Sequence, residues 1–146
     1  MRGSTFHNQV LVRSLDLAFR SLGACPILEH PAGPGRSAGY VDLFIELGAC
    51  RIVCEAEQTA DRVGRDLEKA RLLSATHLLI VTPTARVKRD VLRRLHSPAI
   101  ALPSRSVLHI EVHALGVAIA RLNDFGSFCD QRVCPDVLIP KTPPRE

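Results

Sequence analysis

The stretch from Gly39 to Asp61 constrains the fold most, because it contains two strand-like segments joined by two residues and running directly into a helical pattern. Residues 40–47 (YVDLFIEL) and 50–57 (CRIVCEAE) are rich in β-branched, aromatic and aliphatic side chains. Only Gly48 and Ala49 separate them, which is the length of a tight hairpin turn. The sequence therefore predicts an antiparallel strand pair followed by a helix.

Three carboxylates fall on this hairpin. Side chains alternate along a strand, so Glu55 and Glu57 point to the same face of the sheet. Asp42, near the start of the partner strand, reaches that face if the pairing register allows it. Clustered carboxylate oxygens are ligands that Mg²⁺ or Mn²⁺ prefers, so we expect one of these ions as cofactor. The competing interpretation is a solvated sheet face whose acids pair with Arg51 or Arg62.

Hydrophobic periodicity predicts the other elements. In chain order they are a helix at residues 6–22, a strand at 25–29, a helix at 60–75, a strand at 76–82, a basic helix at 84–96, a strand at 106–112 and a helix at 113–122. A helix between the hairpin and the next apolar strand implies a right-handed parallel crossover. We expect a three-layer α/β fold with a mixed central sheet flanked by helices. Residues 1–125 would form the single domain, and 126–146 a tail.

Composition limits the classes of protein that fit. A chain of 146 residues is long enough for one domain with a real core. No apolar run is long enough to cross a membrane, and Asp16 and Arg20 interrupt any signal-peptide pattern, so we expect a cytoplasmic protein with no membrane partner. The odd count of five cysteines predicts reduced thiols. The net charge of +4 permits a nucleic-acid partner.

The element order and the acidic positions together resemble the PD-(D/E)XK nuclease superfamily, which has the restriction-endonuclease-like fold. The resemblance spans roughly residues 6–82, with Asp42 at the start of the second strand and Glu55 in the motif on the third. It implies a metal-dependent nuclease that hydrolyses phosphodiester bonds in DNA. Asp42, Glu55 and the backbone carbonyl of Ala56 would hold the metal, and Glu57 would bind a second ion or act as general base.

The sequence departs from the family pattern at Glu57, where a lysine is usual. Some family members carry Glu or Gln there, and in others the basic residue has moved to the following helix. Here that helix offers Arg62, Arg65 and Lys69. Loss of the lysine is also what an inactive relative would show, one that only binds DNA or a protein.

Further residues are expected around the substrate. Glu29 resembles the additional acidic residue before the motif, and Gln58 follows the motif. The outer face of the helix at 84–96 is basic, and its nucleic-acid contacts would be Arg86, Lys88, Arg89 and Arg93. The alternative for this helix is an ordinary solvated face. A homodimer is possible. The sequence also allows a different functional class, a small α/β regulatory domain whose acidic residues only form salt bridges.

Overall fold

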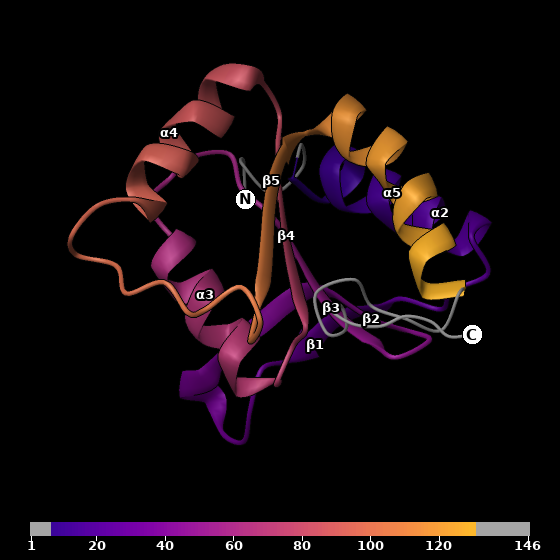
Figure 1. Cartoon of the computed structure of the whole chain (residues 1–146), viewed down its shortest axis with the longest axis horizontal. Coiled ribbons are helices and arrows are strands. Elements are labelled where there is room, and N and C mark those ends of the chain that lie inside the picture. The colour runs from indigo at the N-terminus through magenta and orange to yellow at the C-terminus, as the bar shows by residue number, and fades with distance from the viewer. Residues whose placement is uncertain (1–6, 131–146) are drawn as a thin grey trace.

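The computed structural model describes residues 7–130, apart from the side chains of Asn8, Arg36 and residues 123–130. The described chain forms three layers: a five-stranded sheet lies between two helices on one face and two on the other (Figure 1). This confirms the predicted three-layer α/β arrangement with a mixed central sheet.

The strands lie in the sheet in the order in which they occur in the chain. They are β1 (Ile27–Pro31), β2 (Tyr40–Leu47), β3 (Cys50–Ala56), β4 (His77–Thr82) and β5 (His109–Ala114). The first three pair antiparallel, and β3, β4 and β5 pair parallel. All six residues of β4 are buried, as its continuous apolar sequence predicts for a strand covered on both faces.

The helices divide the core into two clusters. They are α2 (Arg13–Ser21), which follows a short π-helix η1 (His7–Val12), then α3 (Val63–Leu72), α4 (Ala85–Leu95) and α5 (Leu115–Asp130). On one face of the sheet, Leu15 and Phe19 of α2 pack in a cluster with residues of α5. On the other face, Val63 and Leu67 of α3 pack with Val91 of α4. Removal of these aliphatic faces from water is what fixes the helices against the sheet.

Several boundaries differ from those expected. The helix after the hairpin begins at Val63, because the preceding residues form turns in which the Thr59 hydroxyl accepts a hydrogen bond from the Asp61 amide at 3.3 Å. The final helix continues to Asp130, past its expected end at residue 122, and residues 131–146 of the expected tail lie outside the described part. The basic helix begins at Ala85, one residue after the expected start, because Thr84 is its N-cap and its hydroxyl accepts from the Val87 amide at 3.3 Å.

The cysteines correct one expectation. Cys25 and Cys54 are free thiols, whereas Cys50 is disulfide-bonded. The prediction of reduced thiols was therefore wrong for Cys50, because neither an odd number of cysteines nor a missing signal-peptide pattern excludes a single disulfide. Across residues 7–130, no helix has the length and apolar character needed to cross a bilayer.

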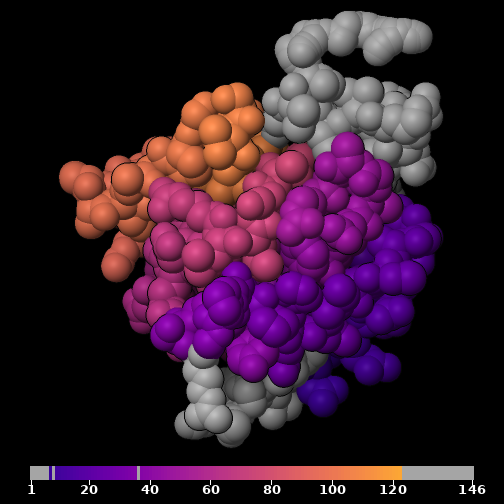
Figure 2. Space-filling model, turned by 90° about the horizontal axis from the view of Figure 1, so that it is seen from below, coloured from indigo at the N-terminus to yellow at the C-terminus, as the bar shows by residue number. Residues whose placement is uncertain are grey.

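The connection between β1 and β2 lies on the surface at one end of the molecule. Figure 2 views that end: the violet surface includes this connection, and the pink and orange surfaces beside it include the segments after α3 and α4. The connection ends at Gly39, whose φ of 76° is a left-handed conformation that glycine adopts readily. Gly39 also lines the cavity described next.

Candidate active site

The site begins where the β2–β3 ladder ends. Regular pairing runs from Leu47–Cys50 to Leu43–Cys54, and the same register places Asp42 opposite Glu55. At this pair the backbone amides donate to carboxylate oxygens instead of to backbone carbonyls. The Asp42 carboxylate accepts from the Ala56 amide at 2.8 Å, and the Asp42 amide donates to Oε1 of Glu55 at 3.3 Å. The register therefore brings together the two acids that the sequence analysis selected.

A third and a fourth carboxylate complete the cluster. One oxygen each from Glu55, Glu57 and Asp66 lie within 4.8 Å of one another, and these three residues could hold a metal ion. All three are buried, at 2%, 8% and 1% exposure. Asp66 comes from α3, which packs over the face of the sheet that carries Glu55 and Glu57. Asp42 is outside this group of three but lines the same cavity.

Lys69, one turn after Asp66 on α3, is the cation of the cluster. Its ammonium nitrogen lies 3.0 Å from Oε2 of Glu55 and 3.8 Å from Oδ1 of Asp66. It also donates to the backbone carbonyl of Tyr40 at 2.8 Å. Lys69 is one of the three basic residues expected from the following helix, and the one that the structure places against the acids.

The protonation of the cluster follows from its burial. Burial raises the pKa of Glu55 to about 8, the charge of Asp42 adds to this, and Lys69 opposes it. Burial, a hydrogen bond with Glu57 and the charge of Glu55 raise the pKa of Asp66 to about 11. Burial and the charges of Asp42 and Glu55 also raise the pKa of Cys54, so this thiol is not a nucleophile at neutral pH. The acids thus need additional positive charge to ionise together.

The residues present fit a hard divalent cation. The cluster offers only carboxylate oxygens as charged ligands, which suits Mg²⁺ or Mn²⁺ better than a softer metal. Oδ2 of Asp66 is buried and accepts no hydrogen bond within the described part of the chain. A buried oxygen without a donor is costly unless a cation or a proton satisfies it. Asp66 also lines the cavity.

The cavity has a volume of about 400 Å³, with acids inside and cations toward solvent. Glu55 and Asp66 lie in its buried part, whereas Arg62 and Arg65 line it from exposed positions on and before α3. Gln58, expected near the substrate, lines it as well. This distribution suits a phosphate, whose oxygens would meet guanidinium groups before reaching the acids.

His7 is a site residue that the sequence analysis missed. Its Nε2 lies 3.1 Å from Oδ2 of Asp42, and its side chain lines the cavity from the π-helix η1. Nothing in the local sequence marks His7, because only the packing of η1 against the hairpin brings it there. Asp66 was missed too, although a signal existed: it lies three residues after Val63 and four before Ala70, on the apolar stripe of α3.

Other expected residues lie elsewhere. Glu29 does not line the cavity of the acids. Together with Asp42 it lines a second cavity of about 360 Å³. The Glu29 residue is exposed, and its backbone φ is 50°. Glu29 is also absent from the β1–β2 pairing, which passes from Leu28 directly to His30. On α4, Arg86 and Arg93 line a separate groove, and Lys88 and Arg89 line neither space.

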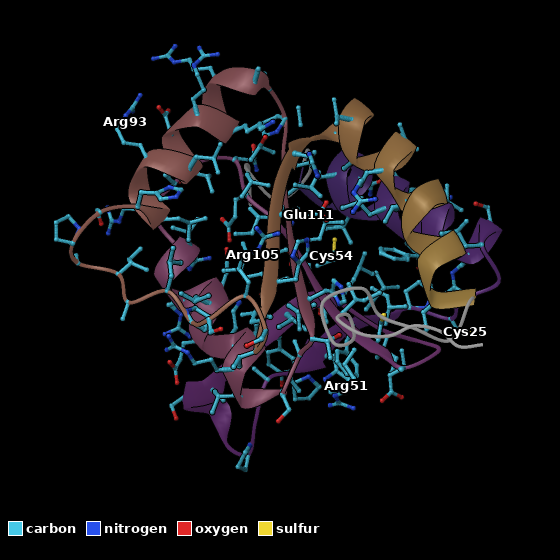
Figure 3. All side chains as sticks on the ribbon, in the orientation of Figure 1. Cys25, Arg51, Cys54, Arg93, Arg105 and Glu111 are labelled. Carbon is cyan, nitrogen blue, oxygen red and sulfur yellow. The ribbon has the colours of Figure 1, made fainter. Side chains whose placement is uncertain are left out.

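A second ionic cluster joins β5 to α5. Glu111 accepts hydrogen bonds from His109 and His113 at 2.8 Å each, and a two-pronged pair from Arg121 at 2.8 and 3.0 Å. Figure 3 shows Glu111 between this strand and helix. Burial alone would raise the pKa of Glu111, but the hydrogen bonds from His109, Arg121 and His113 lower it well below its ordinary value. Four hydrogen bonds satisfy the Glu111 carboxylate, which indicates a structural role for this residue.

Comparisons with models of protein families, with curated proteins and with solved structures find no match for this chain. What the chain does must therefore be argued from the geometry of the site.

Proposed function

We propose that the chain is a cytoplasmic, Mg²⁺- or Mn²⁺-dependent nuclease that hydrolyses phosphodiester bonds in DNA. One observation carries the proposal: two acids from the hairpin and a lysine from α3 converge in one cavity. The backbone amide of Asp42 donates a hydrogen bond to Oε1 of Glu55, and the ammonium nitrogen of Lys69 lies 3.0 Å from Oε2 of Glu55. Two acids and a lysine are the chemical set of the nuclease motif, although here the lysine comes from a helix and Glu57 stands at its usual position.

Each residue has a role that its surroundings support. Asp42, Glu55 and the backbone of Ala56 would hold the ion, and Glu57 and Asp66 would extend its ligand set. A divalent ion bound there supplies Lewis-acid polarisation of the phosphate and a lower pKa for a bound water. His7 holds the Asp42 carboxylate in orientation through its 3.1 Å contact. Arg62 and Arg65 bind phosphate oxygens at the exposed side of the cavity.

Lys69 supplies fixed positive charge beside the acids. Its ammonium stabilises negative charge that develops on the phosphate, and its contact with the Tyr40 carbonyl at 2.8 Å holds it in place. Because α3 rather than β3 carries this group, Glu57 is free to serve as a ligand or as the acceptor of the water proton.

A binding-only protein is the second candidate, and a specific contact favours it. The ammonium of Lys69 already neutralises Glu55 without an ion, as an inactive relative with a closed ionic site would require. In that case the cavity would bind phosphate but leave the ester intact.

The test is cleavage of plasmid and single-stranded DNA in Mg²⁺ or Mn²⁺ by the wild type and by Asp42→Asn and Glu55→Gln. These substitutions keep side-chain shape and remove one charge. Loss of a metal ligand should lower the rate by at least about a hundredfold. Glu68→Gln, at an exposed acid of α3 that lines neither the cavity nor the neighbouring space beside α4, is the matched control and should cleave like the wild type.

Two results would reject the enzyme. Equal cleavage by all variants would show a contaminating nuclease. DNA binding without cleavage, in either metal, would select the binding-only protein.

A further inference from the structure

A second groove lies directly beside the candidate active site. It has a volume of about 950 Å³ and runs between the segment at residues 58–61 and the exposed side of α4. Gln58 and Thr59 line both this groove and the cavity of the acids. The groove and the cavity therefore adjoin at Gln58 and Thr59, and a long ligand could occupy both by passing over these two residues.

The groove is basic on its α4 side. Arg86, Arg93 and Arg94 line it, and Arg89 lies on the same helical row, three residues after Arg86 and four before Arg93. Figure 3 shows Arg93 projecting outward from α4. Opposing charge comes from Asp61 and from Asp90, and Asp90 forms an ion pair with Arg93 at 3.1 Å.

Most of these arginines have no acidic partner. Among the described side chains, no carboxylate forms an ion pair with Arg86, Arg89 or Arg94, and all three arginines are exposed. An ordinary solvated helix face commonly alternates in sign and pairs its charges at three- and four-residue spacing. Here eleven residues of α4 carry five basic side chains and a single acid, which indicates an anionic partner larger than one phosphate.

The side chains also indicate the form of the nucleic acid. Single strands are bound largely by stacking of bases on aromatic rings. No aromatic ring lines this groove, and among the described Phe and Tyr side chains Tyr40 alone is exposed, in the cavity of the acids. Arginines without aromatic platforms suit a phosphate backbone whose bases are already stacked in a duplex.

We infer that the α4 groove binds the sugar–phosphate backbone of a nucleic-acid duplex, on the side of the scissile bond that extends past Gln58 and Thr59. The inference rests on the proposed function, since the active-site cavity fixes where the other part of the duplex lies. It assigns the arginines of α4 to positioning the substrate and not to chemistry.

The experiment measures binding in EDTA, where turnover is absent, with the full chain and three probes of equal length: a DNA duplex, an RNA duplex and an unstructured single strand. The test variant is Arg86→Gln/Arg94→Gln. The control is Arg20→Gln/Arg105→Gln, which removes the same charge from α2 and from the connection before β5. All four positions are exposed, and thermal melting confirms that each variant is folded.

The inference predicts that a duplex binds more tightly than the single strand. The α4 variant should bind that duplex at least about tenfold more weakly at physiological salt, and its slope of log K against log salt should be smaller by about 2, one unit for each lost phosphate contact. The control should match the wild type. The two duplex probes determine whether the backbone is that of DNA or RNA.

Tighter binding of the single strand, or wild-type affinity and slope in the α4 variant, would overturn the inference. These outcomes are separable from the proposed function. Duplex binding through α4 without cleavage in Mg²⁺ or Mn²⁺ would reject the nuclease and keep the groove. Metal-dependent cleavage together with unchanged binding by the α4 variant would support the nuclease and reject the duplex-binding role of the groove.

Discussion

The ammonium nitrogen of Lys69 lies 3.0 Å from Oε2 of Glu55, at side-chain exposures of 14% and 3%. Glu55 belongs to β3, and Lys69 belongs to the helix that covers the same face of the sheet. Two residues after Glu55, just past the end of β3, the chain carries Glu57 and no cation. The positive charge beside Glu55 therefore comes from α3 and not from the end of β3.

This pairing predicts a large effect of Lys69→Met on cleavage. Loss of a fixed positive charge next to the reacting phosphate should lower the single-turnover rate by about two to three orders of magnitude. Lys69→Arg keeps the charge and should retain part of the rate. Arg71→Met, which removes an exposed cation from the same helix, is the control. If Lys69→Met cleaved at the wild-type rate, Lys69 would serve only to neutralise Glu55.

Metal affinity should rise with pH. Metal ligands must be deprotonated, and the pKa of Glu55 is raised to about 8 and that of Asp66 to about 11. At lower pH an ion must displace these protons, so Mn²⁺ affinity measured by calorimetry should increase about tenfold per pH unit for each proton released, up to about pH 8. Repeating the titration in buffers of different ionisation enthalpy counts the protons. An affinity independent of pH across this range would mean that neither acid is a ligand.

Asp66→Asn should separate metal binding from stability. In the metal-free protein the folded pKa of Asp66 lies above the unfolded value of 3.8, so the folded state holds a proton that the unfolded state has released. The free energy of unfolding of the wild type therefore falls as pH rises above about 4. The amide side chain of the Asp66→Asn variant does not ionise, so the variant does not lose stability in this way. At pH 8 we expect Asp66→Asn to be more stable to urea by about 1–3 kcal/mol, yet to bind Mn²⁺ more weakly.

The exposed Asp61→Asn is the matched control for Asp66→Asn and should change neither quantity. A destabilised Asp66→Asn protein with unchanged Mn²⁺ affinity would contradict the placement of Asp66 in the metal site.

Glu111→Gln should destabilise the protein without abolishing the active-site chemistry. Its carboxylate accepts from His109, His113 and Arg121, so the substitution removes the negative charge that these three side chains share. We expect a loss of about 2–4 kcal/mol in urea unfolding at neutral pH. Glu46→Gln, which breaks the exposed pair with Arg51 at 2.7 Å, should cost less than about 1 kcal/mol.

The Glu111 effect should also depend on pH in a stated direction. The folded pKa of Glu111 is lowered beneath its unfolded value of 4.5. Its ionised form therefore contributes stability above about pH 4.5, and the contribution disappears as pH falls through the folded pKa. The difference between wild type and Glu111→Gln should shrink on acidification. A difference that stays constant down to the acid transition would mean that packing, and not charge, accounts for the loss.

Local sequence rules predicted much of the fold for clear physical reasons. The hairpin at β2 and β3 follows from strand alternation and a two-residue turn, and the burial of β4 from its unbroken apolar run. The crossover helix follows from its 3.6-residue pattern. The boundary at Val63 did not follow, because the turn residues before it make hydrogen bonds that compete with the helix.

For the site, the sequence by itself determined which acids the hairpin carries on one face. Alternation along β3 puts Glu55 and Glu57 together, and the hairpin register sets Asp42 opposite Glu55. Only the tertiary structure decided that Asp66 and Lys69 join them, that His7 contacts Asp42 and that Glu29 does not enter the cavity. The reason is the sequence separation of the interacting residues: strand and turn geometry depend on residues that are close together in the chain. The docking of α3 and η1 on the sheet, by contrast, depends on apolar surface contributed by the whole chain.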